Sequence, residues 1–224
     1  MTFSVAGLCR RTGQMGAAIT TSSPAVGSRC PWARAGVGVV LSQNITDPRL
    51  GPQGLDLMAG GLAAQAALEA LMSGAPHLDH RQLALLDAEG RTATFSGKQT
   101  LGTNAAQTGT DCVAAGNLLA TPEVPRAMVA SFEASSDLAL ADRLITALGR
   151  GLSAGGELGE VKSAALLVVA DQSWPYVDLR VDWHNDPTAE LARLWPIYEP
   201  QAEAYITRAL DPDAAPSYGV PGDD

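Results

Sequence analysis

Aromatic and basic residues are both scarce in this chain. Only 5% of the 224 residues are Phe, Trp or Tyr, and 15 Lys and Arg stand against 24 Asp and Glu, a formal charge of −9. This acidic balance opposes binding to a phosphate backbone, so we expect no nucleic-acid partner. Because 46% of the residues are apolar, the chain has the material for one substantial core, packed closely through many Ala and Gly.

Long hydrophobic runs and paired cysteines are also missing. No stretch approaches the ~20 apolar residues that span a bilayer, and no basic segment followed by an apolar core opens the chain, so we expect a cytoplasmic protein without membrane contact. Cys9, Cys30 and Cys112 are odd in number and form no C-x-x-C motif. They predict neither a disulfide framework nor a zinc site, and we expect them reduced and mostly buried.

Strict alternation of strands and helices is absent, as is any glycine-rich phosphate-binding motif. Apolar periodicity predicts an α+β protein, a four-layer α-β-β-α sandwich of two largely antiparallel sheets. We expect one domain over residues 1–210 and a flexible, acidic, proline-rich tail over 211–224. The predicted strands are 2–9, 15–21, 36–41, 81–87, 91–96, 111–115, 163–170 and 177–182, and the predicted helices are 53–73, one opening at 122, 137–150 and 187–210.

The residue after Met1 has distinctive chemistry. Removal of Met1 would give Thr2 a hydroxyl and a free α-amine on the same residue. A Thr hydroxyl is a weak nucleophile and needs a nearby base, which in amino-terminal nucleophile enzymes is the residue's own amine. That amine titrates near pH ~7.7 to 8.0, so a usable fraction is neutral at about pH 7. Thr at position 2 is common, so its meaning depends on the motifs in the rest of the chain.

Six motifs spread over nearly the whole chain resemble one family. The motifs are Met1-Thr2-Phe3-Ser4-Val5, residues 31–38 (PWARAGVG), residues 47–52 (DPRLGP), residues 115–119 (AGNLL), residues 163–167 (SAALL) and residues 178–182 (DLRVD). With them the chain is similar to the family catalogued as Domain of Unknown Function 1028, which the resemblance places within the amino-terminal nucleophile (Ntn) hydrolases. This implies the four-layer sandwich and amide-bond hydrolysis by Thr2 through an acyl-enzyme.

The resemblance also implies partners for Thr2. Ntn hydrolases place a basic side chain beneath the nucleophile, and Arg34 matches that position, while Asn117 resembles a polar residue near the amine. Glu160 and Ser163 resemble an acid and a serine that hold the amine. Two departures stand out: Arg replaces the usual lysine and cannot remove a proton, and residues 20–23 (TTSS) replace an acid.

The oxyanion of an acyl transfer needs converging hydrogen-bond donors. We expect them from the 42–44 loop, which carries Gln43 and Asn44, or from Asn117. Ser22 and Ser23 precede a proline and fit either contacts with the amine or ligand, or a plain turn. With Ser163, these residues make up the predicted substrate contacts.

Two other polar groups fit structural roles better than functional ones. His77 and His80 are three residues apart, but no complete ligand set accompanies them, so we expect no metal and no cofactor. Arg180, Asp182 and His184 alternate along a predicted strand and fit either a pocket for an acid group or an ion-paired edge, of which we favour the edge.

Three functions remain open. The first is an Ntn-type amidohydrolase of a small-molecule amide, with Thr2, Arg34 and Asn117 as its catalytic residues. The second is a metabolite-binding protein that keeps the fold without catalysis. The third is a structural oligomer whose last helix pairs between subunits through Trp195, Tyr198 and Tyr205. For any of these we expect a homo-oligomer, with a dimer favoured.

Overall fold

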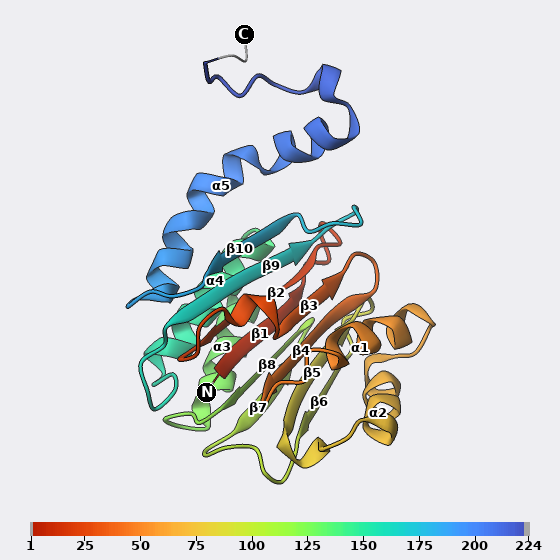
Figure 1. Cartoon of the computed structure of the whole chain (residues 1–224), viewed down its shortest axis with the longest axis vertical. Helices are drawn as coiled ribbons and strands as arrows, with labels where there is room; N and C mark the ends of the chain where they lie inside the picture. Colours follow the sequence, from red (N-terminus) through yellow and green to blue (C-terminus); the bar gives the residue numbers. More distant parts are fainter. Residues whose placement is uncertain (1, 222–224) are drawn as a thin grey trace.

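The computed structural model describes residues 2–221, which form two antiparallel sheets flanked by helices (Figure 1). The six-stranded sheet has the order β10 (Val177–Val181), β9 (Ser163–Val169), β2 (Met15–Thr21), β1 (Thr2–Leu8), β8 (Cys112–Asn117) and β7 (Ala105–Gly109). The four-stranded sheet has the order β3 (Pro31–Arg34), β4 (Gly38–Asn44), β5 (Arg81–Asp87) and β6 (Thr92–Ser96). The α-helices are α1 (Leu50–Ala59), α2 (Ala64–Gly74), α3 (Glu123–Ala134), α4 (Leu140–Ser153) and α5 (Pro187–Leu210).

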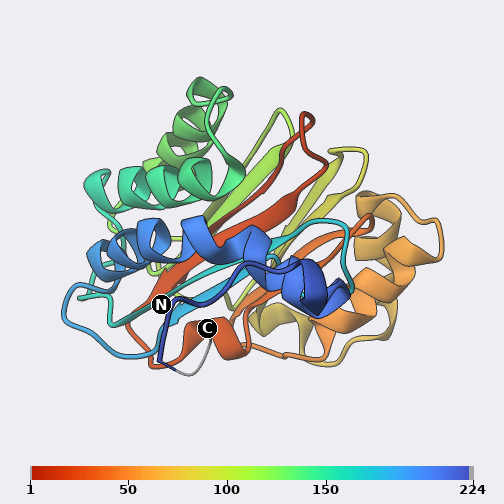
Figure 2. The same ribbon diagram turned by 90° about the horizontal axis from the view of Figure 1, so that it is seen from above.

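The two sheets stack face to face with helices outside, which confirms the predicted α-β-β-α sandwich (Figure 2). Three apolar clusters separate the layers. One lies between the six-stranded sheet and α3, α4 and the first half of α5, a second lies between the sheets, and a third lies between the four-stranded sheet and α1 and α2. Each sheet therefore buries both faces.

Strand β1 is buried on both faces and paired on both edges. Its side chains alternate: Phe3 and Val5 face the helices, whereas Ala6 and Leu8 face the other sheet. By the same alternation Thr2 points to the space between the sheets. The neighbours of β1 are β2 and β8, so the strand is central and its conformation is fixed along its whole length.

One predicted helix differs from the structure, and two strands of the structure were not predicted. The helix predicted over 53–73 is wrong: the chain breaks into α1 and α2 at Gly60 and Gly61, and Gly61 has a left-handed φ of 95°. Strand β3 was missed because Pro31–Arg34 is too short for a periodic signal. Strand β7 was missed because its sequence, Ala105–Gly109, is mostly exposed at a sheet edge and carries no apolar alternation.

The last helix, α5, begins against the six-stranded sheet and extends away from it (Figure 1). Trp195 donates a hydrogen bond to Asp142 at 3.0 Å, and the Tyr198 hydroxyl donates to the Tyr176 carbonyl at 3.1 Å. These contacts anchor the first half within the chain. The predicted tail starts where α5 ends, and its residues 222–224 lie outside the described residues, as does Met1. Among the described helices, none is long and apolar enough to cross a bilayer.

The close approach of α3 to β1 yields a first prediction. A Cβ added at Gly7 would lie 2.2 Å from Cζ of Phe132, a ring that is fully buried. We expect Gly7→Ala to lower the free energy of unfolding by about 1–3 kcal/mol through overpacking, as measured by urea denaturation. Gly149→Ala in α4 is the matched control, because no atom outside its chain neighbours and its own helix backbone lies within 4 Å of the added methyl. Equal stability of the two variants would contradict the packing described.

Candidate functional site

Thr2 lies at the start of the central strand, in register with Thr21 of β2 and Asn117 of β8. Its hydroxyl donates a hydrogen bond to the Thr21 hydroxyl at 3.2 Å, and Thr2 is only 5% exposed. The three polar side chains lie at one end of three adjacent strands, where β1 begins and where β2 and β8 end. The fold therefore brings together Thr2 and Asn117, two of the residues selected from the sequence.

A network of buried amides joins the two sheets behind Thr2. The Gln82 side-chain oxygen accepts from Gln43 at 2.8 Å and from Asn117 at 3.0 Å. The Gln82 nitrogen donates to the Gly116 carbonyl at 3.0 Å, and Ser4 donates to the Gln43 side-chain oxygen at 2.7 Å. All these side chains are buried, where unpaired polar atoms are costly. The network thus holds Gln43 and Asn117 in fixed positions.

Asn117 retains one unused acceptor. Its side-chain oxygen is buried and has no hydrogen-bond partner among residues 2–221. Since buried polar atoms are nearly always paired, such an atom commonly marks a place where a ligand or water completes the site. Gln82, for which the sequence predicts no role, orients Asn117 by accepting its hydrogen bond. Its only sequence signal was a polar residue at the start of an otherwise apolar strand.

Ser163 of β9, which is in register with Thr21, holds the loop that follows β2. The Ser163 hydroxyl donates to the Ser23 carbonyl at 2.7 Å and accepts from the Val26 N–H at 3.1 Å. Thr20 donates to the Ser163 carbonyl at 2.8 Å. Ser22 and Ser23 are half-buried next to Thr21. Ser163 is therefore near the site, and both of its hydroxyl contacts are to the main chain.

Residues 42–44 form the end of strand β4, not the loop we expected. Asn44 has a left-handed φ of 75°, and its side chain joins two loops: it donates to the His80 carbonyl at 2.6 Å and accepts from the Leu101 N–H at 3.2 Å. Both ends of this side chain are engaged in holding those loops. Of Gln43 and Asn44, only Gln43 belongs to the buried network behind Thr2.

Arg34 does not lie beneath Thr2, where the resemblance placed it. It is the last residue of β3, in register with Gly38, which lies at the opposite end of β4 from the amide network. Its guanidinium pairs with Asp56 at 2.7 Å, and its side chain is 43% exposed. The sequence predicts the third strand over 36–41, but the chain turns there between β3 and β4, which moves Arg34 to the far edge.

The acid near this site is Glu157, not Glu160. Glu160 is 84% exposed and pairs with Lys162 at 2.8 Å. Glu157 is 6% exposed, and neither carboxylate oxygen has a hydrogen-bond partner of normal geometry within residues 2–221. It forms a β-bridge with Leu119, two residues beyond Asn117. We call Thr2, Thr21, Asn117 and Glu157 the Thr2 site.

Burial raises the pKa of Glu157 to about 7, although the nearby Ser22 main chain opposes the shift. A carboxyl with this pKa exchanges its proton near neutral pH. The sequence did contain a signal: Glu157 follows Gly155 and Gly156 and has no Lys or Arg within four positions. Both glycines have a positive φ, and the turn they form folds Glu157 back onto the segment after β8.

The other candidate groups lie outside the Thr2 site. Arg180 pairs with Asp178 at 2.7 Å on the edge strand β10, and the His77 main chain adopts a left-handed turn, with φ 58°. Within the part of the chain that the structure describes, no group of three or more His, Cys, Asp or Glu side chains is arranged to hold a metal ion.

Fold and site define an α+β protein of four layers, with a hydroxyl-bearing residue and a buried carboxyl at the head of its central strand. The chain belongs to the family of unknown function DUF1028, whose model matches residues 2–191. A crystal structure is known for a protein of the same family, SPO2555 from Silicibacter pomeroyi, which is 31% identical to this chain. The two structures superpose with a TM-score of 0.82 over 88% of this chain and 85% of SPO2555.

A second solved structure is more distant. It is Anbu, the ancestral β-subunit, from Yersinia bercovieri, with 10% identity, a TM-score of 0.40, and coverage of 91% of this chain and 97% of that one. None of the curated proteins compared with the chain matches it.

The amide network behind Thr2 yields a second prediction. Gln82→Leu would leave the Gln43 and Asn117 amide groups buried without their shared acceptor. We expect the free energy of unfolding to fall by roughly 2–5 kcal/mol, measured by urea denaturation. Gln107→Leu on the exposed edge strand β7 should change it by no more than about 0.5 kcal/mol. A similar small change for Gln82→Leu would mean that the network is not formed.

Proposed function

We propose that this protein is an Ntn-type amidohydrolase whose nucleophile is Thr2 and whose substrate is a small amide. The observation that carries the proposal is the position of Thr2, on the inner face at the head of the central strand, in register with Thr21 and Asn117. The four-layer fold and the resemblance to Ntn hydrolases support it. The proposal requires that Met1 be removed, so that the Thr2 amine is free.

In the proposed reaction the Thr2 amine takes the hydroxyl proton as Oγ attacks the amide carbonyl. The carbon–nitrogen bond then breaks, and the amine returns the proton to the leaving nitrogen. Water, deprotonated by the same amine, hydrolyses the Thr2 ester and releases the acid. Asn117 lies in register with Thr2, and its hydrogen bond to Gln82 fixes its amide beside the nucleophile.

Glu157 has a supporting part in this proposal. Its carboxylate is buried near the head of β1, whereas Arg34 lies at the far edge and Lys162 is paired with the exposed Glu160. When ionised, Glu157 stabilises the protonated Thr2 amine that forms during attack, and so acts as a positioning residue. It supplies an acid that Ntn hydrolases often carry at the end of the second strand and that residues 20–23 (TTSS) replace in this sequence.

The first test is covalent labelling of Thr2. Intact-mass spectrometry should show the purified protein lighter by one methionine. A β-lactone probe should add its full mass to Thr2, because ring opening by Oγ leaves an ester. Thr2→Ala should abolish the adduct while folding is retained, and Thr2→Ser should keep it. Retention of Met1, or equal labelling of the Thr2→Ala variant, would overturn the proposal.

The pH dependence of labelling tests Glu157. Because its pKa is raised to about 7, Glu157 is protonated below that pH and cannot stabilise the ammonium. We expect the labelling rate of the wild type to fall as pH drops through about 7. Glu157→Gln should label roughly ten-fold more slowly at pH 8 and should lose the part of this fall that Glu157 causes, keeping only the part that comes from protonation of the Thr2 amine. The exposed Glu160→Gln variant is the matched control, and an unchanged profile for Glu157→Gln would remove Glu157 from the site.

A non-catalytic metabolite-binding protein is the second candidate. The observation that favours it is a separate cavity, lined by charged residues, at the other end of β1. An inert Thr2 combined with binding in that cavity would support this candidate.

The expected homodimer also stays a proposal. It now depends on the outer half of α5, because Trp195 and Tyr198 make contacts within the chain.

A further inference from the structure

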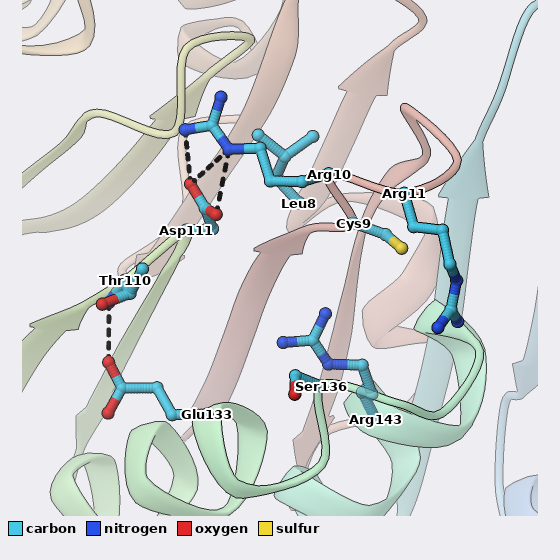
Figure 3. A pocket seen from close by; sticks show the side chains of 9 residues that line it. All are labelled: Leu8, Cys9, Arg10, Arg11, Thr110, Asp111, Glu133, Ser136 and Arg143. Carbon is cyan, nitrogen blue, oxygen red and sulfur yellow. Dashed lines mark hydrogen bonds and ion pairs between the residues drawn. The ribbon is translucent and has the colours of Figure 1, made fainter.

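A cavity of about 490 Å³ lies at the end of β1 opposite Thr2 (Figure 3). This volume is within the usual range for small-molecule sites. The turn from β1 to β2, the turn from β7 to β8, the end of α3 and the start of α4 surround it. The side chains that line it are those of Leu8, Cys9, Arg10, Arg11, Thr110, Asp111, Glu133, Ser136 and Arg143.

Arg143 is a buried cation without an acidic partner. It is 6% exposed and takes part in no ion pair within residues 2–221. Its Nε and Nη2 donate to the Phe132 carbonyl at 3.3 and 3.1 Å, and its guanidinium carbon lies 3.8 Å from the centre of the Phe132 ring. An arginine stays charged even here, and burying an unpaired charge is costly. In so acidic a chain, this absence of a carboxylate points to an external anion.

The other charges around the cavity are not equivalent. Arg10 and Asp111 neutralise each other through a bidentate contact, with distances from 2.7 to 3.0 Å. Arg11 donates to the carbonyls of Asp137 and Leu138 and has no acidic partner among the described residues. Arg11 and Arg143 therefore give the inner part of the cavity a positive charge.

Cys9 also lines the cavity. Burial acts to raise the pKa of its thiol, but hydrogen bonds from Thr12 and from the Arg11 main chain outweigh burial, the Arg11 charge adds a smaller part, and the net pKa is lowered. In Figure 3 the Cys9 sulfur and the Arg143 guanidinium lie on the same side of the cavity. The charges of Arg11 and Arg143, neither of which has an acidic partner among the described residues, favour an anionic group at this side.

Glu133 supplies an opposite charge to the same cavity. One of its oxygens accepts from the Thr110 N–H at 2.7 Å, and the carboxylate forms no ion pair within residues 2–221. Figure 3 shows Glu133, from α3, across the cavity from Arg11. A simple anion would bind near Arg143 against the repulsion of Glu133. A simple cation would bind near Glu133 against the repulsion of the two arginines.

We propose that this cavity binds a small zwitterion of the amino-acid class, with its carboxylate on Arg143 and its ammonium on Glu133. Such a ligand gives Arg143 and Glu133 each an oppositely charged partner and leaves the net charge of the cavity unchanged. Arginine presents a planar fork that matches a carboxylate. The proposal is independent of the chemistry at Thr2, because the two sites lie at opposite ends of β1.

Calorimetric titration with the standard amino acids, one at a time and up to about 10 mM, tests the proposal. Acetate and methylammonium serve as single-charge probes. At least one amino acid should bind at least about ten-fold more tightly than either probe. Failure of every amino acid to bind would overturn the proposal, and acetate binding as tightly as the best amino acid would overturn the zwitterion assignment.

Variants locate the binding. Glu133→Gln changes an exposed side chain and should weaken the best amino acid about ten-fold or more, as should Arg143→Met. Glu123→Gln and Arg126→Met alter an exposed ion pair on the same helix as Glu133 and should leave binding unchanged. If Arg143→Met does not fold, the affinity of Glu133→Gln for the best amino acid tests the location by itself. Undiminished affinity in Glu133→Gln would place the ligand elsewhere, and Thr2→Ala should retain full affinity.

Discussion

The stacking of the two sheets depends at one end on a buried amide. Most of the interface between the sheets is apolar, but at the head of β1 the contact is made through Gln82, whose side chain uses both its oxygen and its nitrogen. Its partners come from β4 and β6 in its own sheet and from β8 in the facing sheet. Apolar contacts tolerate small sliding, whereas hydrogen bonds of this kind do not. The network therefore sets the relative position of the sheets, and with it the surroundings of Thr2.

Much of the fold could be predicted from the sequence, because strand and helix periods are local properties. The break between α1 and α2 could not, since Gly60 and Gly61 lie within a continuous apolar pattern. The site was less accessible to prediction. Arg34 was misplaced because the position of a side chain along a sheet depends on where its strand begins. Glu157 was missed because its burial results from pairing with Leu119, which no local pattern encodes.

The two ends of β1 have different chemistry although they are separated by a strand of only seven residues. At Thr2 the neighbours are mainly neutral hydroxyls and amides, joined by one carboxyl. Beyond Leu8 the neighbours are charged, and they include Arg143, which packs on α3 through Phe132. Because the helices and turns that surround each end are different, a substitution at one end leaves the contacts at the other end in place.

The pairing of the first hairpin also bears on how the chain is made. Thr21 of β2 pairs with Ser163 of β9, and Thr2 of β1 pairs with Asn117 of β8, so both neighbours of the hairpin are synthesised late. Contacts this far apart in sequence are slow to form. On the ribosome the hairpin therefore has two open edges until β8 (Cys112–Asn117) has emerged, and its β2 edge stays open, in a form prone to associate with other strands, until β9 (Ser163–Val169) has emerged.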